Sequence, residues 1–291
     1  MPTVAGALAE AVGRVARTVE APVLVCAGRT DAGVHASGQV VHVDLPEGYD
    51  GDLARAVNRQ LAPEIVVRRA VPAPAPEGSD FDARRSATWR RYRYLVLSSA
   101  APDPLLASVA WHVPFPLDVR AMAGACDPLV GEHDFRAFCR RPPGADPAAP
   151  IVRRVTSAGW HEVRGGWTRE DWATDPRAGG DRTGGVGAPG PVAAAGTREA
   201  GDGPWPPRLL RFDVVATSFC HQMVRSIVAV LVDAGRGRAT AATVMGLLAA
   251  GSRAGAPQPA PAHGLCLVAV GYPDVPDVPG LPGLPAGASA P

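Results

Sequence analysis

Residues 26–44 read CAGRTDAGVHASGQVVHVD and place one acidic residue, Asp31, between Gly28 and Gly33, with Arg29 two positions before it. A turn is the simplest interpretation, because an aspartate side chain accepts hydrogen bonds from nearby backbone N–H groups and glycine tolerates a positive φ. A chemical interpretation is also open, since a carboxylate presented on a turn can attack carbon as a nucleophile. The stretch itself favours the turn, so the rest of the chain has to decide.

A second candidate is the run from Arg84 to Tyr94, which contains five arginines, Trp89, Tyr92 and Tyr94 and no acidic residue. Arginines bind phosphates and aromatic rings stack on bases, and both are needed for RNA binding. A solvated strand face with aromatic residues in the core explains the composition equally well. The run therefore leaves both interpretations open.

Two further groups of polar residues come later in the chain. His221 and Arg225 in SFCHQMVRSIV are four residues apart, so they share a face of a predicted helix, and the first turn of a helix favours anions. Routine polar residues at a helix end are the simpler interpretation. We interpret His133 and Asp134 in GEHDF as polar residues of a loop. The sequence has no zinc-ligand spacing, Walker loop, dinucleotide fingerprint or nucleophile elbow, so it predicts neither a metal nor an organic cofactor.

Hydrophobic spacing predicts the elements that position these residues. Helices are expected at 3–19, 53–61, 118–130, 220–234 and 240–250, and strands at 22–27, 39–44, 65–71, 90–98, 109–113, 151–155, 209–216 and 265–270. Asp31 thus lies in a connection between two strands. Because strands outnumber helices without strict alternation, we expect an α+β fold with a mainly antiparallel sheet and helices on one face.

The composition limits the class of protein. The chain has 29 basic residues, all of them arginine, against 28 acidic residues, so a site for a polyanion has to be a local patch. Five scattered cysteines without a C-x-x-C pair are typical of a reduced, cytoplasmic chain without structural zinc. No stretch approaches the ~18 apolar residues of a membrane span, and no signal-peptide pattern begins the chain. The sequence predicts a soluble protein.

Five segments together resemble the tRNA pseudouridine synthases of the TruA type. They are AGRTDAGVHASGQVVH at 27–42, FDARRSATWRRYRY at 81–94, GEHDF at 131–135, HQMVRSIV at 221–228 and GLCLVAVGYP at 264–273. The segments occur in that family's order and cover nearly the whole chain, and the first is the most specific.

The resemblance implies a pseudouridine synthase fold of two similar α+β halves around a basic active-site cleft, at 1–104 and 105–272. A composition rich in Gly and Pro predicts a flexible insertion at 165–207 and a disordered tail at 273–291. The resemblance also implies a cytoplasmic homodimer, without metal or organic cofactor, that isomerises uridine to pseudouridine at positions 38, 39 and 40 in the anticodon stem-loop of tRNA. On the matching positions, Asp31 is the catalytic aspartate, and Tyr92, Arg29, Arg84 and Arg225 bind the substrate.

The chemistry fits these residue types. The C1′–N1 bond must break and the uracil must rejoin through C5, so the base leaves the stack and is held while it turns. A carboxylate can attack either the ribose C1′ or the uracil C6, or remove a sugar proton to give a glycal, and the sequence leaves these routes open. The Tyr92 ring offers a stacking face, and its hydroxyl is a candidate base for the C5 proton.

Three features depart from the family pattern. The family normally has a strand before the helix at 3–19, and this sequence starts directly at that helix, so we expect either that the true start lies upstream or that the sheet has lost a strand. Asp82 stands where a histidine is common, and the insertion at 165–207 is longer than usual. The first departure motivates an alternative, a catalytically impaired protein that binds tRNA. Another alternative is a carboxylate-based hydrolase of a nucleoside or sugar, for which Asp31 lacks an evident second carboxylate.

Overall fold

The segment that carries Asp31 belongs to a different part of the molecule from the residues on either side of it. The computed structural model describes residues 3–73, 81–141, 144–146, 148–163 and 205–273. Unit 1 comprises Met1–Arg29, Gly38–Thr88 and Val270–Pro276, and unit 2 comprises Thr30–Ser37, Trp89–Ala269 and Asp277–Pro291. The consecutive halves 1–104 and 105–272 are a different division of the chain and stay a prediction.

Unit 1 is built on two helices, α1 (Val4–Ala16) and α2 (Leu53–Leu61), and on β1 (Val25–Cys26), which pairs antiparallel with β3 (Val41–His42). Ala11 and Val12 of α1 form a buried cluster with Val57 of α2. Thr3 Oγ1 accepts a hydrogen bond of 3.0 Å from Gly6 N and so caps α1. The predicted helix at 53–61 is confirmed. The first helix is confirmed too, but it ends at Ala16, because Arg17 adopts a left-handed conformation with φ of 56°.

The strand expected at 65–71 is wrong. The side chain of Asn58 donates to Val67 O at 2.8 Å and accepts from Val67 N at 2.7 Å. Because α2 satisfies these two backbone groups through a side chain, the segment runs beside the helix without joining a strand ladder.

Unit 2 is built around a sheet of seven strands among the described residues. Its order is β2 (His35–Ala36), β9 (Leu265–Gly271), β4 (Trp89–Ser98), β8 (Arg208–Ala216), β7 (Val152–Glu162) and β6 (Gly131–Asp134), while β5 (Trp111–Val113) also pairs with β4. The pairs β4–β8, β8–β7 and β7–β6 are antiparallel, whereas β2–β9 and β4–β5 are parallel. The α+β class with a mainly antiparallel sheet is confirmed. The loop expected at GEHDF is wrong, because His133 and Asp134 lie in β6 and pair with β7.

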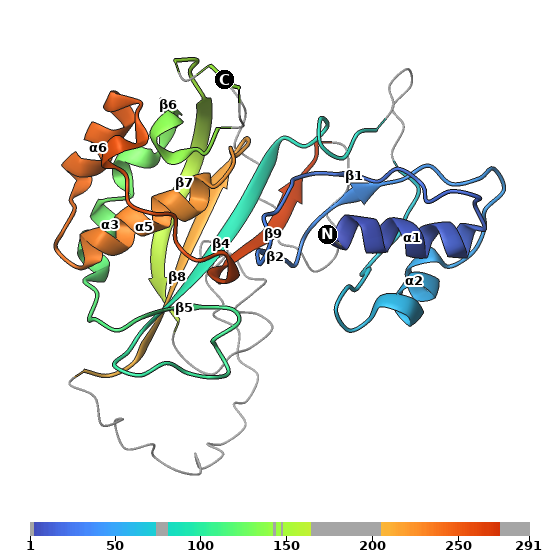
Figure 1. Ribbon diagram of the computed structural model, residues 1–291, viewed down its shortest axis with the longest axis horizontal. Coiled ribbons are helices and arrows are strands. Elements are labelled where there is room, and N and C mark those ends of the chain that lie inside the picture. Colours follow the sequence, from blue (N-terminus) through green and yellow to red (C-terminus); the bar gives the residue numbers. More distant parts are fainter. Residues whose placement is uncertain (1–2, 74–80, 142–143, 147, 164–204, 274–291) are drawn as a thin grey trace, which may run out of the picture. The chain divides into compact units, whose positions relative to one another are not determined.

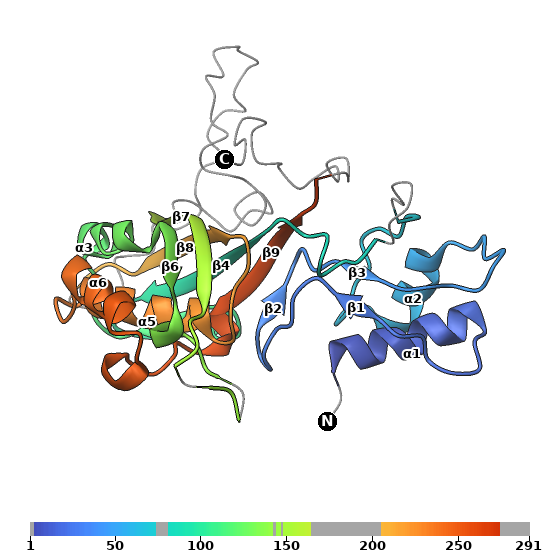
Figure 2. The same ribbon diagram turned by 90° about the horizontal axis from the view of Figure 1, so that it is seen from above.

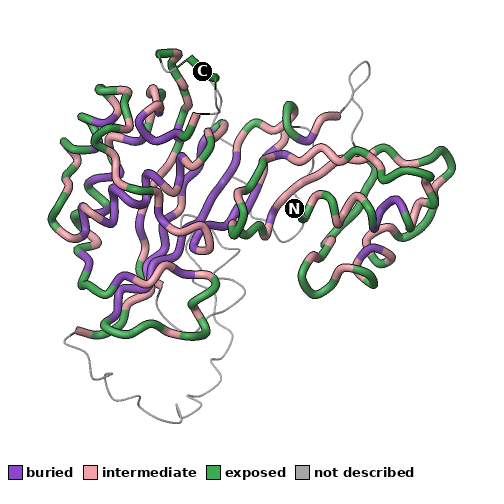
Figure 3. Tube along the Cα trace, in the orientation of Figure 1, coloured by how far each residue is buried: buried purple, intermediate pink, exposed green. Residues whose placement is uncertain are grey.

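Three helices of unit 2, α3 (Val119–Gly124), α5 (Met223–Gly235) and α6 (Ala241–Ala250), gather beside the sheet. Helix α5 is buried along most of its length, and Figure 3 shows the buried residues concentrated in this helix and the central strands. The helix expected at 118–130 ends at Gly124. A 3-10 turn, Asp127–Leu129, follows it, because Pro128 has no N–H to continue an α-helix.

The arginines of β4 are largely inside the protein. Arg90, Arg91 and Arg93 are 9%, 8% and 2% exposed, and Arg93 Nε lies 2.9 Å from Asp213 Oδ1 on β8. Arg211 Nε approaches the other carboxylate oxygen of Asp213 at 2.7 Å. This burial favours the structural interpretation of the strand arginines, whereas Arg84 and Arg85, which precede the strand, are exposed.

Some expectations lie outside the described residues, namely most of the insertion at 165–207 and the tail at 273–291 beyond Pro273. None of the helices in the described ranges is both long and apolar enough to cross a bilayer.

Gly264 tests how tightly the start of β9 packs on the core. A Cβ at this residue would lie 2.6 Å from the ring of Tyr94, which is fully buried and donates from its hydroxyl to Pro261 O at 2.7 Å. We expect Gly264→Ala to lower the free energy of unfolding by about 1–3 kcal/mol, measured by urea denaturation.

Gly246→Ala is the matched control, because its Cβ would meet nothing within 4 Å on α6. Alanine is the better helix former, so this variant should gain about 0.5–1 kcal/mol. Equal stability of the two variants would contradict the packing described for Gly264.

Candidate active site

Asp31 opens a turn with its backbone and leaves its side chain for other contacts. Val34 N donates to Asp31 O at 3.1 Å, and Gly33, at the third position of this turn, has φ of +82°. Side chains rarely adopt that conformation, and a Cβ there would also lie 3.3 Å from Ala262 Cβ. The turn interpretation is thus correct for the main chain of Asp31, while the carboxylate remains available for chemistry.

The two oxygens of the Asp31 carboxylate are held by different residues. Arg225 Nη1 donates to Oδ2 at 3.1 Å, and His221 Nε2 lies 3.2 Å from Oδ1. The Asp31 side chain is 30% exposed, so the held carboxylate can still be reached from outside the protein. The spacing of His221 and Arg225 therefore marked an anion site, although His221 lies just before α5, not in its first turn.

Hydrogen bonds to Ala260 hold both the side chain and the backbone of Arg225. Its Nε donates to Ala260 O at 2.7 Å, and its backbone carbonyl accepts from Ala260 N at 3.0 Å. The side chain is only 16% exposed. Because these contacts fix the guanidinium, the carboxylate of Asp31 meets a donor whose position is already set.

Tyr92 lies in β4, opposite Val214 of β8, and its ring packs edge-on against Phe219 with a centroid distance of 5.0 Å. Burial raises the pKa of Tyr92 to about 12, Arg90 opposes this shift, and the negative charge of Asp31 adds to it. The phenol is therefore neutral near pH 7. This favours the ring as a packing surface and the hydroxyl as a hydrogen-bond donor over a role as base for the C5 proton.

Three residues in a row before α5 contact three different parts of unit 2. Phe219 packs on Tyr92, Cys220 forms a disulfide with Cys139, and His221 contacts Asp31. The expectation that all cysteines are reduced is wrong in this structure, because the fold brings Cys139 and Cys220 together across 81 residues of sequence. Sequence spacing carried no sign of this pairing.

Arg29 and Arg84 belong to unit 1, so the group that the structure brings together is Asp31, Tyr92, Arg225 and His221. Both arginines of unit 1 are exposed. Asp82 organises the turn that presents Arg84: its Oδ1 accepts from Arg84 N and Arg85 N, both at 2.8 Å. The hydrogen bond from Arg85 N is the main reason why the pKa of Asp82 is lowered. Asp82 therefore has a local structural role.

Unit 1 also carries a hollow of about 660 Å³ whose lining includes four arginines. Arg55 and Arg59 come from α2, and Arg68 and Arg69 from the segment after it; all four are exposed. Asp52 is the acidic residue in the lining, and it also caps α2 by accepting from Arg55 N at 3.0 Å. The cationic excess makes this surface suited to polyanions. Sequence reasoning missed it, because the arginines are separated along the chain.

Within the part of the chain that the structure describes, no group of three or more histidine, cysteine, aspartate or glutamate side chains could hold a metal ion.

The raised pKa of Tyr92 predicts how stability depends on pH. Because the folded pKa of about 12 lies above the ordinary value of 10, folding favours the protonated phenol. This contribution is complete below pH 10 and is lost as the pH rises toward 12, by about 2–3 kcal/mol. Urea denaturation at pH 9, 10 and 11 should show a smaller loss of stability for Tyr92→Phe than for the wild type.

Tyr49→Phe is the matched control, because it removes a phenol hydroxyl of unit 1, outside β4. A Tyr92→Phe protein that loses stability as steeply as the wild type would refute the assignment.

A family model described as tRNA pseudouridine synthase matches residues 125–273. Proteins named tRNA pseudouridine synthase A are similar to most of the chain. The one from Frankia casuarinae is 41% identical over 275 residues, covering 93% of this chain and 81% of its own length. The one from Methylobacterium nodulans is 38% identical, with 94% and 87% covered, and the one from Streptomyces griseus is 36% identical, with 93% and 80% covered.

These matches include the loop before α5, and they extend over the Asp31 segment in the relatives' alignments, which cover more than nine-tenths of the chain. They give no support to the alternative of an impaired RNA-binding protein. Sequence similarity on this scale establishes that the chain belongs to the tRNA pseudouridine synthase family.

Proposed function

We propose that this member of the family converts uridine to pseudouridine at positions 38, 39 and 40 in the anticodon stem-loop of tRNA, with Asp31 as the nucleophile. The observation that carries the proposal is the Asp31 carboxylate, partly exposed and held by Arg225 and His221. Family membership supports the reaction, and the geometry supports the choice of residue.

During the reaction the site has to hold the uracil base while one bond between the base and the sugar is replaced by another. The C1′–N1 bond breaks, a C1′–C5 bond forms, and the proton on C5 is replaced by one on N1, so substrate and product are isomers. No electrons pass to another molecule, so the reaction needs no redox cofactor, and we propose that it proceeds without a metal or an organic cofactor, as the family resemblance implies. The uridine leaves the base stack before it reacts.

Asp31 can act as a nucleophile while it is held, because each carboxylate oxygen has two acceptor directions. One contact to Arg225 or His221 occupies one direction of each oxygen, and the other remains for attack on C1′ or C6. Fixing the carboxylate before the substrate binds lowers the entropic cost of reaching the reactive geometry. Tyr92 is 8% exposed, so we propose that the flipped base contacts only the small accessible part of its ring.

The arginines of unit 1 are proposed to bind the RNA backbone. Arg29 and Arg84 are exposed and suited to phosphates of the substrate. The hollow lined by Arg55, Arg59, Arg68 and Arg69 is also suited to tRNA phosphates. A homodimer that acts in the cytoplasm completes the proposal, as the family resemblance implies.

The catalytic role of Asp31 is tested by Asp31→Asn. The amide is similar in shape but is not a nucleophile, so we expect pseudouridine formation on an anticodon stem-loop substrate to fall by at least about 10³-fold. The affinity for tRNA should change by less than about threefold, because the arginines of unit 1 that are proposed to bind the RNA backbone are unchanged. Pseudouridine mapping and a filter-binding assay measure the two quantities.

Asp44→Asn, an exposed aspartate of unit 1, is the matched control and should keep full activity. An active Asp31→Asn protein would exclude Asp31 as the nucleophile. Release of free uracil by the wild type would instead identify a hydrolase.

The arginine-lined hollow is tested by the double variant Arg55→Glu/Arg68→Glu. We expect tRNA affinity to fall by about tenfold or more at 0.15 M salt. The slope of log affinity against log salt concentration should become shallower by the amount that corresponds to the loss of about two phosphate contacts. The value of kcat at saturating tRNA should stay unchanged, because the hollow does not contribute to the Asp31 group.

Arg120→Glu, an exposed residue at the start of α3, controls for the loss of positive charge in general. If it weakens binding as much per charge as the double variant, the hollow has no special role in binding RNA.

A further inference from the structure

The loop before α5, residues 218–222, contacts both Asp31 and Tyr92. His221 Nε2 lies 3.2 Å from Asp31 Oδ1, and the ring of Phe219 packs on Tyr92. Cys220 stands between them and forms the disulfide with Cys139. Any shift of the backbone at Cys220 therefore moves both neighbouring contacts.

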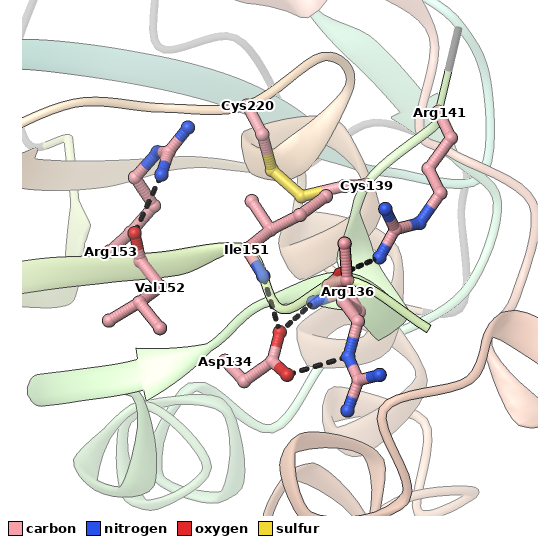
Figure 4. Close-up of a disulfide and its surroundings, with 9 residues drawn as sticks. Asp134, Arg136, Cys139, Arg141, Ile151, Val152, Arg153 and Cys220 are labelled. Carbon is pink, nitrogen blue, oxygen red and sulfur yellow. Dashed lines mark hydrogen bonds and ion pairs between the residues drawn. A yellow bond between two sulfur atoms is a disulfide. The ribbon is translucent and has the colours of Figure 1, made fainter. Parts of the chain in front are cut away.

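The other half of the disulfide is anchored firmly. Cys139 is 2% exposed and follows a short 3-10 turn, Arg136–Phe138, whose Ala137 and Phe138 are fully buried. Asp134 accepts from Ile151 N at 2.9 Å and from Arg136 N at 3.1 Å, and it pairs with Arg136 Nε at 2.6 Å. Figure 4 shows these contacts around the disulfide. The segment that ends at Cys139 is thus fixed to β6 and β7.

Backbone hydrogen bonds hold the loop at three residues. Arg140 N donates to His221 O at 2.9 Å, Met223 N donates to Cys220 O at 3.1 Å, and Ser226 N donates to Gln222 O at 3.0 Å. Gln222 adopts a left-handed conformation with φ of 66°, which is costly for a residue other than glycine. The His221 side chain is 47% exposed. The disulfide links this loop, with its strained Gln222, covalently to the buried segment that ends at Cys139.

We propose that the Cys139–Cys220 disulfide is a reversible tether that positions His221 and Phe219 against Asp31 and Tyr92, so that its reduction slows pseudouridine formation. The two cysteines are positioning residues, since neither touches the reacting atoms. The proposal rests on the proposed function, because the loop serves the Asp31 group. The Cα–Cα distance of 5.8 Å is ordinary for a disulfide, so the backbone need not move for the bond to form.

The tether opens and closes by thiol–disulfide exchange with a small dithiol or disulfide. A thiolate attacks Sγ of Cys220, which is more accessible than Cys139, and the Cys139 thiolate leaves and takes a proton from water. A second thiol of the reductant then displaces Cys220, so two electrons pass to the protein and the reductant becomes a disulfide. Oxidised glutathione reverses the exchange and is itself reduced to two thiols.

The experiment compares the full-length protein after dithiothreitol with the same protein after oxidised glutathione. We expect kcat for pseudouridine formation to be about tenfold lower in the reduced protein, because small displacements of positioning groups are costly. The KM for tRNA should change by less than about twofold, since the arginines stay in place, and reoxidation should restore kcat. Cys139→Ser and Cys220→Ser should have the lower kcat in both conditions.

Cys26→Ser is the matched control, because Cys26 lies in β1 of unit 1. It should respond to reduction and oxidation as the wild type does. If it no longer responds, the redox effect comes from Cys26 and the tether is refuted.

Hydrogen exchange separates failure of the tether from failure of the proposed function. Reduction should speed exchange of the Arg140 and Met223 amides, whether or not the protein is active. If peptide mapping finds no Cys139–Cys220 bond after oxidation, if exchange is unchanged when the bond is broken, or if an active protein keeps the same kcat, the tether is wrong. If exchange responds but neither state forms pseudouridine, the disulfide still positions the loop and the proposed function is wrong.

Discussion

The contact between Asp31 and Arg225 joins two residues 194 positions apart, and the arrangement of the candidate site depends on it. The pair is partly exposed, so its contribution to stability is at most about 1 kcal/mol. Its importance lies in orientation, because Arg225 is also bonded to Ala260 and cannot follow a displaced carboxylate. The fold therefore provides a fixed cation, and Asp31 takes its position from that cation.

The same constraint explains the surroundings of α5. Most of the helix is buried and apolar, which fixes its axis in the core, and its polar contacts are concentrated at its start. Residues 260–264 are held there by Arg225 and Tyr94, and Gly33 packs against Ala262 of that segment. The polar groups of the candidate site are thus held by the buried core at the start of α5, and a site needs this kind of rigid support to keep its groups in a reactive geometry.

Two features show how burial changes the chemistry expected from residue types. Tyr92 was a candidate base, but burial keeps its phenol protonated, and its aromatic ring becomes the more useful part. Arg93 was a candidate phosphate ligand, but it is buried and paired with Asp213 inside the sheet. In both cases the sequence predicted the strand correctly. The interaction partner and the burial of each side chain, which the sequence does not show, assign it a different role from the one expected.

Sequence by itself determined most of the elements, the family and the residues of the main motifs. Helix α2 and strands β4, β8 and β9 follow from local spacing, because hydrophobic periodicity and capping act over a few residues. The failed strand at 65–71 depended on Asn58, and the pairing of Cys139 with Cys220 and the contact of His221 with Asp31 depended on distances between segments far apart in the chain. Tertiary structure alone decided these features, because a hydrogen bond, a disulfide or an ion pair forms only where the fold brings its two atoms within a few ångströms.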